Sequence, residues 1–271
     1  MSIDKHYDQS LQPEWILEQV HSAYPEGANL FQLAPLDQLH IGGIKASERL
    51  LRHLDPGRHN RILDIGSGAG GLMRQASALG FSMIGLDITH AFNRLNLGLN
   101  RCLSSQVSNP IITADAHHLP FVDESIDLIL FQHSFLNMPD NRRVLDECCR
   151  VLMPGGSLLM HEVVCGEHPE QMRYPVPWAQ DAAHSHLTRQ QTLLQQLQQS
   201  GFSEVRIDDW SDEALAWRKR QLDKEQSGGA IRALLSPTMV LGPRFATMGK
   251  NLVLNLESRA IRVVEVVATR N

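Results

Sequence analysis

A glycine-rich turn at residues 66–71 follows directly on an apolar run at residues 61–65, and a helical pattern begins after it. Glycine lets the backbone approach a ligand closely, and the first N–H groups of the following helix point toward that ligand. The order of apolar run, glycine turn and helix is therefore typical of a site for a nucleotide-like molecule. The spacing of Gly66, Gly68 and Gly71 also matches the dinucleotide pattern, so the turn alone leaves open which adenosine-bearing molecule binds.

Strand and helix patterns alternate after residue 60. Helical periodicity predicts helices near residues 69–79, 91–104, 140–151 and 188–200. The repeated order of strand, helix and strand predicts a doubly wound, mostly parallel sheet in an α/β fold. Seven strands are predicted, near residues 61–65, 82–87, 110–114, 126–132, 156–164, 203–207 and 261–269.

Helical segments flank this sheet in the sequence. Pro13 opens one amphipathic helix, and a second follows Gly42 and Gly43. About fifty residues separate the last two predicted strands, which is too long for a hairpin, and helical patterns near 212–224 and 251–256 predict an inserted cap. We therefore divide the chain into an N-terminal helical lid segment (1–56), a core (57–210), a helical cap (211–258) and a last core strand (259–271).

Composition limits the classes of partner. The formal net charge of −5 provides no basic surface for nucleic acid, and no apolar stretch is long enough to predict a membrane span. The polar start, Met1 to Asp8, lacks the apolar core of a secretory signal, and the four cysteines show no Cys-x-x-Cys spacing. We expect a cytoplasmic protein with reduced thiols that acts on a small molecule, and we leave open assembly into a homodimer.

Three carboxylates discriminate between adenosine-bearing ligands. Asp64 lies within an otherwise apolar strand, where a carboxylate is costly unless a ligand or hydrogen-bond donors satisfy it. Asp87 ends the second predicted strand, 21 residues after Gly66, where it can accept both hydroxyls of a ribose. Asp115 follows the third strand and is well placed to accept from an adenine amino group. Proteins that bind NAD rarely show this combination.

These residues, together with residues 125–132 and 150–156, resemble the motif series of the class I S-adenosylmethionine-dependent methyltransferases. The resemblance runs from about residue 40 to the end of the chain. It implies a Rossmann-like fold and S-adenosyl-L-methionine (SAM) as the methyl donor. Residues 40–43 and 132–140 further resemble the small-molecule branches of the family, namely the sarcosine and dimethylglycine N-methyltransferases and the ubiquinone/menaquinone-biosynthesis type.

The resemblance also assigns roles to residues. Asp64, Gly66 and Gly68 are implied to surround the methionine part of SAM, Asp87 the ribose, and Asp115 with Ala116 the adenine. The complete predicted donor site is Asp64, Gly66, Ser67, Gly68, Gly70, Asp87, Ile88, Asp115, Ala116 and Gln132. The segment that begins at His40 is implied to fold across the donor as a lid, and Trp178 is a candidate wall of the substrate pocket.

Candidate catalytic residues follow from the chemistry of methyl transfer. Displacement at a sulfonium methyl depends mainly on positioning and on exclusion of water, and a general base adds about 10²–10⁴-fold. Gln132 and His133 follow the fourth predicted strand, and His161 and Glu162 lie late in the fifth. We rank His133 first and Glu162 second as the catalytic base. The alternatives are that His133 braces the donor or packs under the cap, and that Glu162 caps a backbone turn.

Other conspicuous side chains have simpler explanations. His117 and His118 are adjacent, but neighbouring histidines on a turn usually point apart and no further ligand spacing supports zinc, so we predict no metal. Cys148 and Cys149 lie on an apolar helical stripe and are predicted to pack in the core. Trp210 and Trp217 are likewise predicted to be mostly core.

We predict a SAM-dependent methyltransferase that acts on N, O or C of a small-molecule metabolite. Residues 132–135 lack the Asn/Asp-Pro-Pro-aromatic turn of enzymes that methylate DNA amines. Two alternatives stay open. The first is a sensor or assembly protein that binds SAM without catalysis, and the second is a nicotinamide oxidoreductase.

Overall fold

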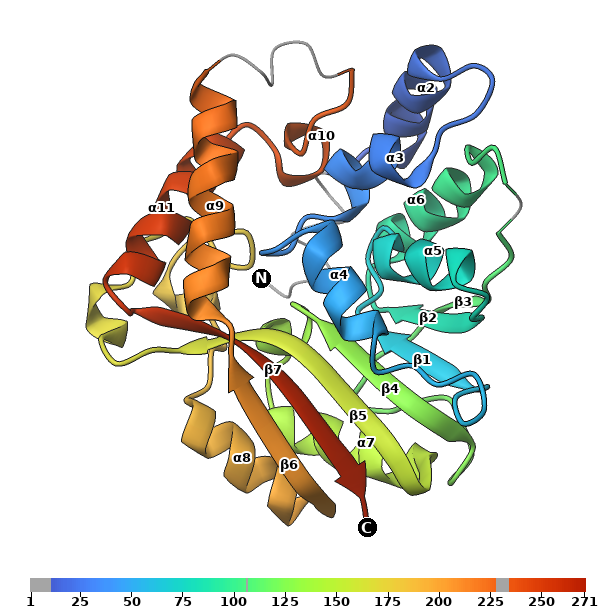
Figure 1. The fold of residues 1–271 in the computed structure, drawn as a ribbon, viewed down its shortest axis with the longest axis vertical. Coiled ribbons are helices and arrows are strands. Elements are labelled where there is room, and N and C mark those ends of the chain that lie inside the picture. The colour runs from blue at the N-terminus through green and yellow to red at the C-terminus, as the bar shows by residue number, and fades with distance from the viewer. Residues whose placement is uncertain (1–10, 106, 228–233) are drawn as a thin grey trace.

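Seven strands form one sheet in the order β3-β2-β1-β4-β5-β7-β6 (Figure 1). The computed structural model describes residues 11–105, 107–227 and 234–271, so the start Met1 to Asp8 lies outside the described residues. Strand β7 pairs antiparallel with β5 and β6, and the remaining pairs are parallel. The predicted α/β fold with a mostly parallel seven-stranded sheet is confirmed. The strands are β1 (Ile62–Ile65), β2 (Met83–Asp87), β3 (Ile111–Thr113), β4 (Ile126–Gln132), β5 (Leu152–Cys165), β6 (Phe202–Asp209) and β7 (Ile261–Arg270).

Helices cover both faces of the sheet. Along β4, Leu128 and Leu130 pack with α4 (Ile44–Leu51) and α5 (Gly71–Ala78), whereas Ile129 and Phe131 pack with α7 (Asn141–Val151) and α8 (Gln190–Gln199). Successive side chains of a strand point to opposite faces, so a strand buried on both sides is apolar throughout. The apolar run Leu128 to Phe131 therefore marks β4 as a central strand. Helix α6 (His90–Arg101) joins β2 to β3 and packs against α2 (Pro13–Ala23).

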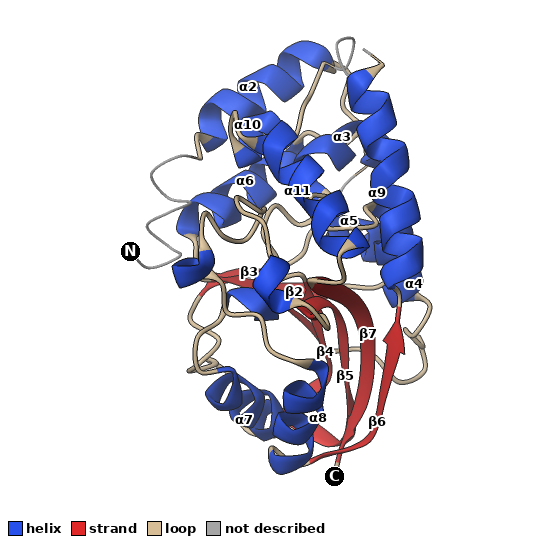
Figure 2. Cartoon of the chain, turned by 90° about the vertical axis from the view of Figure 1, so that its left-hand side faces the viewer, coloured by secondary structure: helices blue, strands red, loops and turns tan. Residues whose placement is uncertain are grey.

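A second group of helices lies beyond one end of the sheet (Figure 2). It contains α2, α3 (Leu30–Asp37), α9 (Ser211–Gln226), α10 (Thr238–Leu241) and α11 (Phe245–Glu257). Helices α9 to α11 are inserted between β6 and β7, as the cap patterns predict, while the domain boundaries stay a prediction. Within the described ranges, no helix is both long and apolar enough to cross a membrane.

Helix α3 and strand β5 are among the elements that differ from the sequence-based expectation. Helix α3 was not predicted because Pro35 lies inside it, although Asn29 and Gln32 form a capping box that marks its start. Strand β5 begins at Leu152 rather than near residue 156. The segment 154–156 is typical of a turn, but a register shift in the pairing of β4 with β5 accommodates it within the strand.

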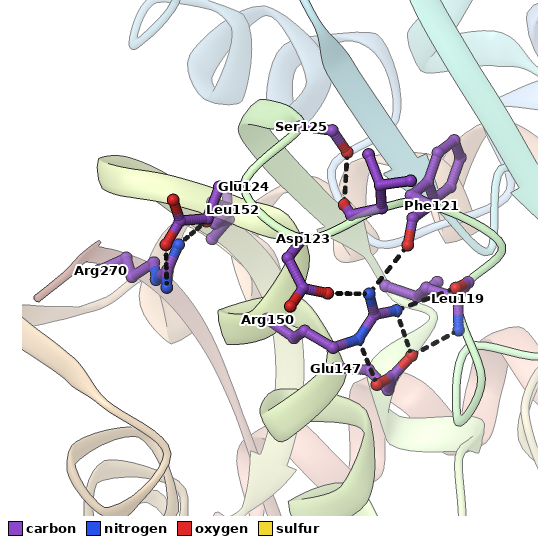
Figure 3. A network of polar contacts seen from close by, with 10 residues as sticks. Leu119, Phe121, Asp123, Glu124, Ser125, Glu147, Arg150, Leu152 and Arg270 are labelled. Carbon is purple, nitrogen blue, oxygen red and sulfur yellow. Dashed lines mark hydrogen bonds and ion pairs between the residues drawn. The ribbon is translucent and has the colours of Figure 1, made fainter.

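Arg150 of α7 holds the loop that leads from β3 to β4 (Figure 3). Its guanidinium donates to both carboxylate oxygens of Glu147 at 2.8 Å and to the backbone oxygens of Leu119 and Phe121 at 3.0 and 2.8 Å. The Leu119 N–H in turn donates to Glu147 at 2.8 Å. Because these bonds fix the end of the loop, they also restrain the preceding turn, which carries Asp115.

Candidate active site

A cavity of about 600 Å³ lies at the carboxyl ends of β1, β2 and β4. Ligands of open α/β sheets bind at this edge. The lining includes nine of the ten residues predicted for the donor site: Asp64, Gly66, Ser67, Gly68, Asp87, Ile88, Asp115, Ala116 and Gln132. It also includes the predicted catalytic residue His133 and the predicted lid and substrate residues His40 and Trp178.

The glycine turn interlocks with the turn that follows β4. Gly66 has φ +74°, and a Cβ there would lie 2.3 Å from Cβ of Ser134. The Ser134 hydroxyl donates to the Ile65 carbonyl at 2.6 Å. At Gly68, by contrast, a Cβ would have no described atom within 4 Å. Gly66 is therefore needed for close packing, while Gly68 leaves open space beside the cavity.

Gly70 is the one predicted donor-site residue that lies outside the cavity lining, and its contact with the donor stays a prediction. It has φ +83°, and a Cβ there would lie 2.0 Å from Oδ1 of Asn96. Glycine is required here because the turn packs against α6. The following residue, Gly71, lines the cavity instead.

Two buried carboxylates, Asp64 and Asp87, lie at the centre of the site, and their negative charges repel each other. Asp64 is 2% exposed, and burial, reinforced by the neighbouring charge of Asp87, raises its pKa to about 7. Asp87 accepts hydrogen bonds from the N–H groups of Gly68 at 2.9 Å and Thr89 at 2.8 Å. A cationic ligand would relieve the repulsion between the two carboxylates, so the site favours a positively charged molecule.

Asp115 and His117 link the turn after β3 to the loop after β4. Asp115 Oδ1 accepts from the His117 N–H at 2.9 Å and contacts its Nδ1 at 2.6 Å, while Nε2 faces the Pro139 carbonyl. Burial lowers the pKa of His117, but the bonds to Pro139 and Asp115 outweigh it, so the net pKa is raised. Both ring nitrogens are thus engaged by oxygen atoms, and the described residues contain no cluster suited to a metal ion.

Three imidazoles lie together at the cavity: His161 is buried, and His40 and His133 are half-buried and line it. The rings of His133 and His161 are stacked at 5.1 Å, and the ring of His40 lies 5.8 Å from that of His133. Burial lowers the pKa of all three, to about 3 for His40 and about 4 for His161, and well below the usual value for His133. All three rings are therefore neutral at pH 7.

The three rings differ in their hydrogen bonds. His40 Nε2 donates to the Gly43 carbonyl and His161 Nε2 to the Ile41 carbonyl, each at 3.0 Å. His133 Nε2 is buried and has no partner among the described residues. His133 also has φ +53°, a conformation that costs a residue other than glycine roughly 1–3 kcal/mol. A strained residue with an unpaired ring nitrogen, in the wall of a cavity, is typical of a functional position.

Glu162 does not line the cavity. Its side chain lies under the turn that follows β4, where Oε1 accepts the N–H groups of Ser134 and Phe135, each at 2.8 Å. Burial raises its pKa to about 7 although these hydrogen bonds oppose the shift. The structure thus argues against the prediction that Glu162 is the catalytic base and favours the alternative that it holds a backbone turn.

The lid segment is attached to both the sheet and the cap. Ser47 of α4 exchanges hydrogen bonds with the Gln132 amide at 3.1 and 3.2 Å. A Cβ on Gly42 would lie 2.6 Å from the Trp210 ring, and one on Gly43 would lie 3.2 Å from Trp217. Trp210 therefore packs in the core, as predicted, while Trp217 is half-buried and packs against that core.

Several lining residues were not predicted as site residues. They come from α3 and the segment after it, α6, the loop after β4, the segment between β5 and α8, and α10: Asp37, Leu39, Phe92, Asn137, Met138, Pro139, Pro177, Ala183, His184, His186 and Leu241. The Pro-Val-Pro-Trp run at 175–178 was the sequence signal for one of these segments. The other residues reach the cavity only through tertiary packing.

Comparison with known proteins agrees with this geometry. A methyltransferase domain model matches residues 63–160. Methyltransferase GfsG of Streptomyces halstedii is 30% identical over 168 residues, which cover 60% of this chain and 58% of GfsG. The ubiquinone/menaquinone biosynthesis C-methyltransferase UbiE of Ralstonia nicotianae is 30% identical over 168 residues, which cover 54% of this chain and 68% of that protein. The chain thus spans less than two thirds of GfsG.

The fold is similar to that of a solved methyltransferase. Phosphoethanolamine N-methyltransferase 2 of Haemonchus contortus, in complex with phosphomonomethylethanolamine and S-adenosylhomocysteine, superposes with a TM-score of 0.74. The superposition covers 97% of this chain and 61% of that one at 16% sequence identity, which shows a shared fold. The matching methyltransferase domain and the similarity to the UbiE relative show the family, and the shared fold and the residues of the cavity agree with it. The chain therefore belongs to the class I S-adenosylmethionine-dependent methyltransferases.

Proposed function

We propose that this protein transfers a methyl group from SAM to N, O or C of a small molecule. The observation that carries the proposal is one cavity lined by the open glycine turn, by the buried pair Asp64 and Asp87, and by His133, whose Nε2 has no partner among the described residues. When bound, SAM supplies an electrophilic methyl group on a cationic sulfonium.

The donor-side residues fit such a molecule. Gly68 leaves room for the methionine part, and Asp64 offers a carboxylate whose ionised form a cation would stabilise. Asp87 ends β2 with its carboxylate fixed by two backbone N–H groups, which orients it toward ribose hydroxyls. Asp115 and Ala116 lie on the neighbouring turn and would hold the adenine.

His133 would take the proton that the acceptor loses. A neutral imidazole is the form that accepts a proton, and the lowered pKa of His133 keeps it neutral at pH 7. His133 Nε2 would bind the proton that the acceptor releases on methylation. Glu162 would act as a positioning residue, because it holds the two N–H groups that directly follow His133.

The acceptor side of the cavity combines apolar and imidazole groups. Trp178, Met138 and Leu241 provide apolar surface, and His184 and His186 add polar atoms. This lining supports a small acceptor with an apolar body. We further propose that the protein acts in the cytoplasm, which agrees with four cysteines that form no disulfide; the net charge of −5 argues against a nucleic-acid substrate. A homodimer stays a prediction.

The proposed reaction is tested by transfer of a labelled methyl group. The protein is incubated with methyl-tritiated SAM and separate pools of amines, phenols and quinols, and label is counted in the extracted products. We expect transfer to at least one pool. Binding of SAM without transfer to any pool would instead favour the alternative of a non-catalytic sensor.

A further inference from the structure

Asp37, the last residue of α3, carries a buried carboxylate with an unused oxygen. Its side chain is 3% exposed. Oδ2 accepts from Arg74 Nε at 3.0 Å and from Arg74 Nη2 at 2.9 Å. Oδ1 accepts no hydrogen bond from any other described residue. A buried oxygen without a donor is unfavourable unless a ligand supplies one.

The partner Arg74 has no donor left for a ligand. Besides its bonds to Asp37, Nη1 donates to Asn96 Oδ1 at 3.0 Å and to Asn100 Oδ1 at 2.8 Å, and Nη2 donates to the Ala69 carbonyl. A guanidinium has five N–H groups, and these contacts use all five. The positive charge of Arg74 is thus engaged within the protein, and Asp37 Oδ1 is the oxygen of the pair that has no donor from another described residue.

Asp37 lies beside the glycine turn. It lines the same cavity as Asp64 and Gly71. A Cβ added to Gly71 would lie 2.3 Å from the Asp37 backbone oxygen, so the end of α3 rests directly on the start of α5. This end of the cavity is where the proposed function places the methionine part of the donor.

We propose that Asp37 Oδ1 accepts a hydrogen bond from the α-ammonium group of the donor's methionine part. The inference rests on the proposed function, since it requires that SAM occupies the cavity. An ammonium has three donors and no acceptor, and its bond to a carboxylate is charge-assisted. Helix α3, which belongs to the predicted lid segment, would then contribute a donor-binding residue outside the motif series.

Two ligands that differ at this group provide the test. S-adenosylhomocysteine contains the ammonium, whereas 5′-deoxy-5′-methylthioadenosine keeps the adenosine and the thioether but lacks the amino-acid part. In the Asp37→Asn variant we expect the affinity for S-adenosylhomocysteine to fall about tenfold or more, because a charge-assisted bond is lost. The affinity for methylthioadenosine should stay within about twofold of the wild-type value, because this ligand lacks the group that Asp37 is proposed to bind. Equal losses for both ligands, or no loss for either, would overturn the inference.

Asp115→Asn is the matched control, because it alters the adenine end and should weaken both ligands alike. If Asp37→Asn does not fold, Asp37→Leu combined with Arg74→Met removes both buried charges and should show the same selective loss. The wild-type protein provides an independent test. It should bind an analogue of S-adenosylhomocysteine that lacks the amino group more weakly than S-adenosylhomocysteine itself. Equal affinity for the two ligands would contradict the inference. A wild-type protein that binds neither nucleoside would contradict the proposed function itself.

Discussion

Replacing Asp64 with asparagine is expected to weaken binding of S-adenosylhomocysteine and to stabilise the ligand-free protein above pH 7. Burial and the charge of Asp87 raise the pKa of Asp64 from 3.8 to about 7. This difference corresponds to roughly 4 kcal/mol between the two protonation states. The α-ammonium group of S-adenosylhomocysteine favours the ionised carboxylate, so the amide should lower the affinity about tenfold or more.

The sign of the effect on stability follows from proton binding. Between pH 4 and pH 7 the folded state holds a proton on Asp64 that the unfolded state has released. The stabilising contribution of this group is therefore complete at low pH and is lost as the pH rises through about 7. The amide introduced by Asp64→Asn carries no charge at any pH, so the variant should gain free energy of unfolding over the wild type at pH 8, and much less at pH 5.

Thermal unfolding at pH 5 and pH 8, with titration of S-adenosylhomocysteine at pH 8, measures both effects. Asp127→Asn is a control for which the expected change in the free energy of unfolding has the opposite sign. Burial raises the pKa of Asp127, but hydrogen bonds from Arg61 and Asn60 outweigh it, and the net pKa is lowered. That variant should lose stability at pH 8 and keep its ligand affinity, because Asp127 lies at the far end of β4 from the cavity. A less stable Asp64→Asn variant with unchanged affinity would contradict the proposed role.

The second large effect is expected for His133→Asn. Asparagine tolerates positive φ better than most residues, so the strained backbone at φ +53° should be retained. Loss of the proton acceptor should lower kcat about 10²–10⁴-fold. Affinity for S-adenosylhomocysteine should change by less than about threefold, since the ring is proposed to act on the acceptor. Turnover and titration on the same preparation separate the two quantities.

The pH profile of the wild type provides a further reading of His133. Because its pKa is lowered, the neutral ring persists from pH 8 to well below 6.5, and turnover should not fall through protonation of this group near pH 6.5. His118 is exposed and outside the cavity, so His118→Asn serves as the control and should keep full turnover. Unchanged kcat in His133→Asn would remove His133 from the mechanism and leave positioning alone as the source of catalysis.

The donor side of the site could be predicted because its residues sit at strand ends. Asp64, Asp87 and Gln132 each lie in or end a strand that the apolar pattern locates, and parallel strands bring such positions to one edge. The place of Gly70 outside the lining could not be predicted in this way. Gly70 packs against Asn96 of α6, the helix that follows β2. No local sequence pattern reveals which residue a glycine turn packs against.

The remaining features depend on tertiary contacts. Asp37 lies at the cavity and is paired with the buried Arg74, which is 37 residues away in the sequence. Glu162 faces the turn after β4 rather than the cavity because of the register between β4 and β5. A side chain near a strand end can point into a ligand site or beneath a loop, and the sequence does not distinguish the two.

The central claim is that the cavity holds SAM, and calorimetric titration of the wild-type protein tests it most directly. S-adenosylhomocysteine and NAD are titrated separately under the same conditions. The structure predicts saturable one-to-one binding of S-adenosylhomocysteine and no saturable binding of NAD. Binding of NAD without binding of S-adenosylhomocysteine would contradict the claim and favour a nicotinamide enzyme.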